Sequence, residues 1–193
     1  MKPRMNKLAV FVIATTMTMF IAVAMTSASG NHLKAIRGEY AATGTLSCNG
    51  YYEDGSLEGS GTVSQLTVYT FDGEGKGSMH GYFVRIGFIP PAEMTFDFSW
   101  DFTYSVGKNG TITTTTVPGT QKWTLPGTDY VILRDMGVDT FSESGWISSD
   151  HKTIVLGTLE PQVQNLILSP PGAPETVFIT KTNASRVLIR IGQ

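Results

Sequence analysis

The sequence predicts an all-β protein, folded as a single antiparallel meander barrel of about 8–10 strands, with a β-sandwich as the alternative. Residues 94–104 alternate strictly between large apolar and small polar side chains, as a strand with two different faces does. Gly, Asn-Gly and Pro-Gly positions divide the rest of the chain into short β-branched and aromatic runs. After residue 37 no stretch has the period of an amphipathic helix, so the crossover helices that parallel strands need are missing.

The N-terminal segment has the pattern of a secretory signal peptide. Basic residues precede an apolar run over residues 8–25, and small side chains follow it. We expect residues 1–29 to be the signal peptide, cleaved between Ala24 and Gly30, and residues 30–193 to form the barrel domain. An uncleaved membrane anchor is the alternative. The mature protein is then exported, to the periplasm or the extracellular space, and keeps no membrane span after cleavage.

Composition argues against several classes of function. The net charge is −2, and no Lys/Arg cluster follows residue 7, so nucleic acid is not an expected partner. Cys48 is the only cysteine, which excludes an internal disulfide framework, and we expect it to be a buried small side chain. The three histidines are far apart in sequence and have no cysteine partner, so we expect no metal site and no cofactor.

The first three strands are expected at residues 39–48, 63–71 and 77–86. The stretch 71–78 (FDGEGKGS) joins the last two of these strands. It lacks the Ser/Thr and the helix of a phosphate-binding loop, and Lys76 takes the place of the third ligand of an EF-type calcium loop. Its glycines suit the positive φ angles of a tight hairpin, so we interpret it as a turn.

The fourth strand, residues 94–104, carries the strongest pattern in the chain. Its small polar face includes Asp97 and Asp101. These lie about 13 Å apart along a strand, further than the paired carboxylates of glycosidases, so we interpret them as a solvated outer face. The opposite face carries six large side chains, Met94, Phe96, Phe98, Trp100, Phe102 and Tyr104.

The remaining strands are bounded by turn residues. Asn109-Gly110 predicts a hairpin into residues 111–117, since this dipeptide favours a type I′ turn. Later strands are expected at residues 130–134, 141–147, 153–159, 176–180 and 186–191.

The candidate site is the inside of this barrel. The aromatic face either fills the core or lines an apolar pocket, because an eight-stranded barrel is just wide enough for one small ligand. His80 and Tyr82 share a face of their strand; if that face points inward, they form a ligand anchor or an acid/base pair. The candidate ligand-binding residues are Phe96, Phe98, Trp100, Phe102, Tyr104, His80 and Tyr82. A G-x-S-x-G nucleophile elbow is missing, and we assign no catalytic residue.

Several stretches resemble a loose group of exported bacterial proteins. They are the start RGEYAATG at residues 37–44 with Cys48 soon after, the hairpin TVYTFDGEG at 67–75, and the last strand SRVLIRI at 185–191. The resemblance implies a calycin-like (lipocalin-like) β-barrel and no established activity. The G-x-W signature of lipocalins is missing near the first strand.

The leading hypothesis is an exported β-barrel protein that binds a small apolar molecule in its barrel. The alternatives are a small-barrel enzyme of the cyclase or isomerase type and an outer-membrane β-barrel whose aromatic face meets lipid. A structural or adhesive surface module also fits. Oligomeric state stays open.

Overall fold

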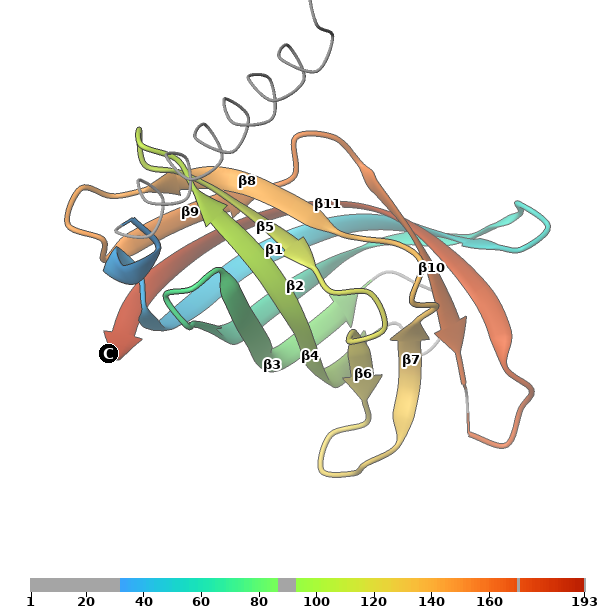
Figure 1. Ribbon diagram of the computed structural model, residues 1–193. Helices are drawn as coiled ribbons and strands as arrows, with labels where there is room; N and C mark the ends of the chain where they lie inside the picture. Colours follow the sequence, from blue (N-terminus) through green and yellow to red (C-terminus); the bar gives the residue numbers. More distant parts are fainter. Residues whose placement is uncertain (1–31, 87–92, 170, 193) are drawn as a thin grey trace, which may run out of the picture.

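The computed structural model describes residues 32–86, 93–169 and 171–192; the expected signal peptide lies outside them. These residues form one 11-stranded antiparallel sheet (Figure 1). The strands are Gly38–Tyr52 (β1), Leu57–Phe71 (β2), Lys76–Ile86 (β3), Glu93–Val106 (β4), Thr111–Thr116 (β5), Lys122–Thr124 (β6), Val131–Asp135 (β7), Ser142–Ile147 (β8), Thr153–Gly157 (β9), Gln162–Leu168 (β10) and Thr176–Gly192 (β11).

The sheet closes on itself. The strand order is β1-β2-β3-β4-β5-β8-β9-β11-β10-β7-β6, and pairings of β1 with β11 and of β4 with β6 complete the closure. Around one half of the barrel the ring is β1, β2, β3, β4, β5, β8, β9 and β11, which is eight strands. Around the other half β6, β7 and β10 replace β5, β8 and β9, so the ring again has eight. The predicted meander barrel is confirmed, and the β-sandwich alternative is not found.

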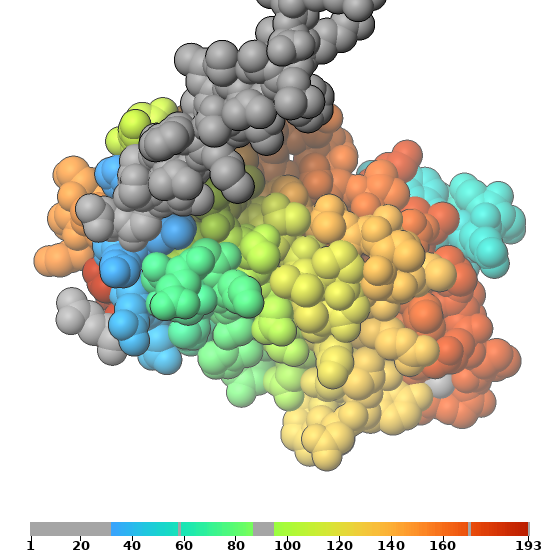
Figure 2. All heavy atoms as spheres, in the orientation of Figure 1, coloured from blue at the N-terminus to red at the C-terminus, as the bar shows by residue number. Residues whose placement is uncertain are grey.

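The strand number exceeds the ring size because three wall strands are each interrupted once. Residues 117–121 separate β5 from β6, residues 136–141 separate β7 from β8, and residues 158–161 separate β9 from β10. We call this line of interruptions the seam. The Asp135 carboxylate joins two of them, since it accepts hydrogen bonds from the backbone N–H groups of Gly119, Gln121 and Gly137 at 2.7–2.9 Å. On the face that Figure 2 shows, the yellow-green to yellow atoms form a continuous surface with their neighbours.

A helical turn, residues 32–35, covers one end of the barrel next to the C-terminal end of β11 (Figure 1). We call this the helix end. Ile36 has no exposed surface there, and the Arg190 guanidinium donates to the backbone oxygens of Ala35 and Arg37. Within the described residues, no helix has the length and apolar character needed to cross a membrane.

The FDGEGKGS stretch is a hairpin turn, as predicted. Gly73 and Gly75 adopt backbone φ angles of 80° and 103°, which residues other than glycine rarely adopt. The Asp72 carboxylate accepts hydrogen bonds from the backbone N–H groups of Glu74 and Lys76 at 2.7 and 2.9 Å. Asp72 therefore stabilises the turn between β2 and β3, and these bonds hold the pKa of its carboxyl below the usual range despite the opposing effect of desolvation.

Candidate functional site

Strands β3 and β4 line one side of the barrel interior with aromatic rings. On β4 every even-numbered residue from Phe96 to Val106 is buried, while the odd-numbered residues face outward. The rings of Phe83 and Phe98 stack with centroids 4.0 Å apart, and Trp100 meets Phe98 edge-on at 4.6 Å. We call this side the aromatic wall.

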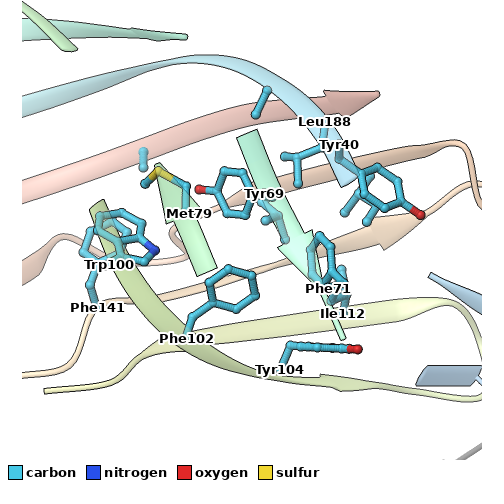
Figure 3. Packing of buried hydrophobic residues seen from close by; sticks show 14 of the residues in the cluster. Tyr40, Tyr69, Phe71, Met79, Trp100, Phe102, Tyr104, Ile112, Phe141 and Leu188 are labelled. Atoms are coloured by element: carbon cyan, nitrogen blue, oxygen red, sulfur yellow. The ribbon is translucent and has the colours of Figure 1, made fainter. Parts of the chain in front are cut away.

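The aromatic wall fills the helix end of the barrel. Phe71 lies 5.3 Å from Phe102 and 5.0 Å from Tyr104, measured between ring centroids, in edge-to-face geometry that favours aromatic pairs. Figure 3 shows these rings packed together, with Trp100 beside Phe141. The helix end is therefore a filled core.

The facing side of the interior carries polar side chains among apolar ones. It is formed by β2, β8, β10 and β11, and its polar side chains are almost completely buried. We call it the polar wall: Gln65, Thr67, Glu143, Gln164, Thr180, Thr182 and Arg186. Apart from the aromatic wall, the interior thus contains a set of groups that need hydrogen-bond partners.

Arg186 and Glu143 form a buried ion pair on this polar wall. The Arg186 guanidinium donates to a Glu143 carboxylate oxygen and, at 2.8 Å, to the Tyr69 hydroxyl. It also lies over the Trp100 ring, 5.1 Å from the centroid. Burial raises the pKa of the Glu143 carboxyl, and Arg186 opposes that shift. Burial likewise raises the pKa of Tyr69.

Gly44 on β1 makes room for this arginine. It pairs with Arg186 across the β1–β11 ladder. A Cβ atom at Gly44 would lie 2.9 Å from Cγ of Arg186 and 2.3 Å from the backbone oxygen of Ser185. A larger residue at this position therefore displaces the arginine or the backbone.

A small cavity of about 30 Å³ lies between the two walls. The aromatic wall contributes rings such as Phe98, and the polar wall contributes Gln164, whose side-chain amide donates a hydrogen bond to the side-chain oxygen of Gln121 in the seam. Among the described residues, the Trp123 indole N–H and the Thr180 hydroxyl have no hydrogen-bond partner, and both residues line the cavity. The volume suits about one water-sized molecule.

The structure separates the predicted ligand-binding residues into two groups. Phe96, Phe98, Trp100, Phe102 and Tyr104 all point into the barrel, where they pack against other rings. The inward placement considered for two others is wrong: His80 is exposed on the outer face of β3, and Tyr82 is 57% exposed there. The inward face of β3 is taken by Met79 and Phe83 instead, so an acid/base pair of His80 and Tyr82 inside the barrel is excluded.

No pattern in the sequence predicts the buried ion pair. Arg186 is followed directly by the apolar run Val187, Leu188 and Ile189, and a charged residue beside such a run is ordinarily expected to face outward. Glu143 lies in a run of Ser and Gly with no charge pattern. Only the closure of β11 onto β1 brings Arg186 within reach of β2 and β8. Among the described residues, no group of three or more His, Cys, Asp or Glu is arranged to hold a metal ion.

The outer surface also has two different sides. A row of cross-strand neighbours runs from β8 to β3 and is apolar except for one threonine. We call it the outer belt: Trp146, Val155, Val187, Thr43, Leu66 and Tyr82. Trp146 and Leu66 are each 65% exposed. Adjacent strands are about 4.8 Å apart, so this row of six strands is about 24 Å wide.

The outer wall over β4 and β5 is polar. On β4 the outward residues are Thr, Ser and Asp, including Asp97 and Asp101, and on β5 they are threonines. The outer belt ends at this side, because the neighbour of Tyr82 on β4 is Asp97.

Comparisons with known proteins identify the fold. No family model matches the chain, and no curated protein matches its sequence. The fold is similar to that of Neisserial surface protein A (NspA), with a TM-score of 0.55 and 7% identity over 80% of this chain and 97% of that chain. Outer membrane phospholipase A from Escherichia coli is 8% identical over 79% of this chain and 90% of that chain, but its TM-score of 0.22 is too low for a shared fold. The likeness to the Neisserial protein shows a shared barrel fold.

Proposed function

We propose that the protein is exported and works as a β-barrel at the outer membrane. The observation that carries this proposal is the closed eight-stranded meander, which shares its fold with a Neisserial surface protein over 97% of that chain. The basic, apolar and small residues at the N-terminus support export. The apolar outer belt supports contact with lipid, because exposed apolar patches mark interaction sites.

Cell fractionation tests this proposal. The full chain is expressed in a Gram-negative host, and the outer membrane, inner membrane, periplasm and medium are separated. We expect the protein in the outer-membrane fraction, with an N-terminal residue from 25 to 30 when it is sequenced. Recovery in the soluble periplasm or the medium contradicts the location, and an intact Met1 contradicts cleavage of the signal peptide.

A second candidate function is binding of a small molecule inside the barrel. It is favoured by the cavity between the aromatic and polar walls and by the unpartnered Trp123 N–H and Thr180 hydroxyl that line it. At about 30 Å³ the cavity takes no fatty acid or retinoid unless rings of the aromatic wall move.

Tryptophan fluorescence tests this second function. Trp100 and Trp123 both line the cavity, so a ligand that enters must change their emission. A panel of fatty acids, retinoids, small alcohols and amides is titrated into the purified protein. Thr180→Val removes the unpartnered hydroxyl and serves as the matched variant. An unchanged emission across the whole panel removes this candidate.

A further inference from the structure

The outer belt is confined to one side of the barrel. Its residues come from the neighbouring strands β8, β9, β11, β1, β2 and β3, and the row is continuous through directly paired residues. Ile189 and Val68 extend it in the next row, joined through Ala41. Trp146 and Tyr82 occupy its two ends, and aromatic residues of this kind favour the interface between lipid and water.

The other side of the barrel is unsuited to lipid. Asp97, Asp101 and Lys122 point outward from β4 and β6, among Ser and Thr side chains. A barrel that spans a membrane has an apolar band around its whole circumference and a polar interior. Here the interior contains the aromatic wall, and the outward faces of β4 and β5 carry only Thr, Ser and Asp among the described side chains, so the apolar band does not run around the whole barrel.

The shape of the belt restricts what can cover it. The ring of strands is closed, so a partner cannot add a strand to a free edge of these strands. A barrel wall is convex, and two convex walls touch along a narrow strip only. Acyl chains and headgroups adapt to a convex surface and can surround each exposed side chain.

The N-terminal part of the chain joins the barrel at this side. Residues 1–31 contain the apolar run, and the chain continues through the helical turn into β1, one of the strands of the outer belt. The turn is attached to β11, another belt strand, by the hydrogen bond from Arg190 to the backbone oxygen of Ala35 (3.3 Å). The apolar run is therefore connected along the chain, through this turn, to two strands of the outer belt.

We propose that the barrel lies against the lipid surface with its outer belt and is not threaded through the bilayer. The belt side chains enter the interface, and the β4 side with Asp97 and Asp101 remains in water. This inference rests on the proposed outer-membrane location and specifies how the barrel meets the membrane.

Vesicle flotation tests the belt directly. The purified mature protein, residues 30–193, is mixed with phosphatidylethanolamine/phosphatidylglycerol vesicles and floated on a density gradient. Leu66→Ser and Trp146→Ser should each weaken binding about tenfold, and about a hundredfold together, because each removes apolar area that lipid would bury. The matched control is Val138→Ser with Leu159→Ser, since these side chains are 71% and 84% exposed in the seam and lie off the belt. Circular dichroism and thermal unfolding establish that every variant is folded.

Brominated acyl chains give a second readout. Trp146 is 65% exposed, whereas Trp100 is 5% exposed, so lipid bromine should quench mainly Trp146. We expect the quench in the wild type and its loss in Trp146→Phe. We call the double variant Leu66→Ser with Trp146→Ser the belt variant, and Val138→Ser with Leu159→Ser the control variant. Equal flotation of these two variants overturns the inference. A wild-type protein that does not float overturns it too.

Two further outcomes identify other arrangements. A spanning barrel stays in the membrane pellet through alkaline carbonate, whereas we expect carbonate to release this protein. Resistance to carbonate therefore overturns the inference while the outer-membrane location stands. A wild-type dimer in solution that the belt variant converts to a monomer without lipid assigns the belt to a second copy, and this also overturns it. Recovery of the protein in the soluble periplasm removes the proposed location itself.

Discussion

Strands β4 and β11 differ in how polarity is divided between their faces, although both strands pair with both halves of the barrel. On β4 the inward side chains are aromatic, and the outward ones include Asp97 and Asp101. On β11 the inward side includes Arg186, while Val187 and Ile189 are 41% and 57% exposed. The direction of a side chain in this barrel is therefore not set by its hydrophobicity alone.

Closure of the barrel explains the difference. The β1–β11 ladder pairs Leu46 with Ala184 and Gly44 with Arg186, which fixes the inward face of β11 over its whole length. A shift by one residue would turn Ile189 inward, but it would also turn Leu188 and Phe178 outward. Arg186 is tolerated inside because Glu143 and the Tyr69 hydroxyl receive its hydrogen bonds.

The inward arginine has a consequence on the outer surface. Because Arg186 and Leu188 point inward, their β-branched neighbours Val187 and Ile189 must point outward. Val187 pairs with Val155 on β9, and Val155 pairs with Trp146 on β8. The register of β11 against β1 therefore places Arg186 in the polar wall and Val187 in the outer belt at the same time.

The largest expected effect is the loss of one partner of the ion pair. Arg186→Met leaves the Glu143 carboxyl buried without its partner, and we expect unfolding free energy to fall by about 3–5 kcal/mol. The double variant Arg186→Met with Glu143→Leu should recover most of this loss, because an apolar pair of similar volume replaces the ion pair. Urea unfolding measures both. A single variant as mild as a surface substitution would mean that Arg186 is not inside.

A smaller effect separates two neighbouring residues of β11. Leu188 has no exposed surface and Ile189 is 57% exposed, although both are large aliphatic side chains. Leu188→Ala should lower the unfolding free energy by about 3 kcal/mol, since it leaves a cavity in the core. Ile189→Ala should change it by less than about 0.5 kcal/mol. The reverse ranking in urea unfolding contradicts the register of β11.

These two strands also show how far the sequence predicts the structure. The faces of β4 were predictable, because eleven residues alternate without exception and each face has one chemical character. The barrel class followed from this strand together with the turn dipeptides. The aromatic part of the candidate site was predictable for the same reason.

Other parts depended on contacts between distant residues. The faces of β11 and the place of Arg186 follow from the pairing with β1, which no local pattern contains. On β3 both faces carry apolar residues, so alternation did not decide that His80 and Tyr82 point outward. The seam was also hidden, since its residues look like ordinary turns until β5 and β6 are both seen to pair with β4.

The polar wall should also make stability depend on pH. Burial raises the pKa of Glu143 above the ordinary value of 4.5, so the folded protein keeps a proton that the unfolded chain has already released. This contribution to stability is present below pH 4.5 and is lost as the pH rises through the higher folded pKa. Glu143→Gln should remove this decline. The test is urea unfolding of both proteins at several pH values; parallel curves contradict the prediction.

The smallest expected effect on the unfolding free energy comes from the Tyr104 hydroxyl, which lies on β4 at the helix end of the barrel. The Tyr104 hydroxyl accepts a hydrogen bond from the backbone N–H of Gly73 at 2.8 Å and donates to Asp72 at 3.3 Å. Tyr104→Phe keeps the ring and should lower the unfolding free energy by about 1 kcal/mol. Its control is Thr103→Ser, on the outer face of the same strand. Amide hydrogen exchange at Gly73 should accelerate in Tyr104→Phe alone; unchanged exchange would show that the aromatic wall does not hold the β2–β3 turn through this hydroxyl.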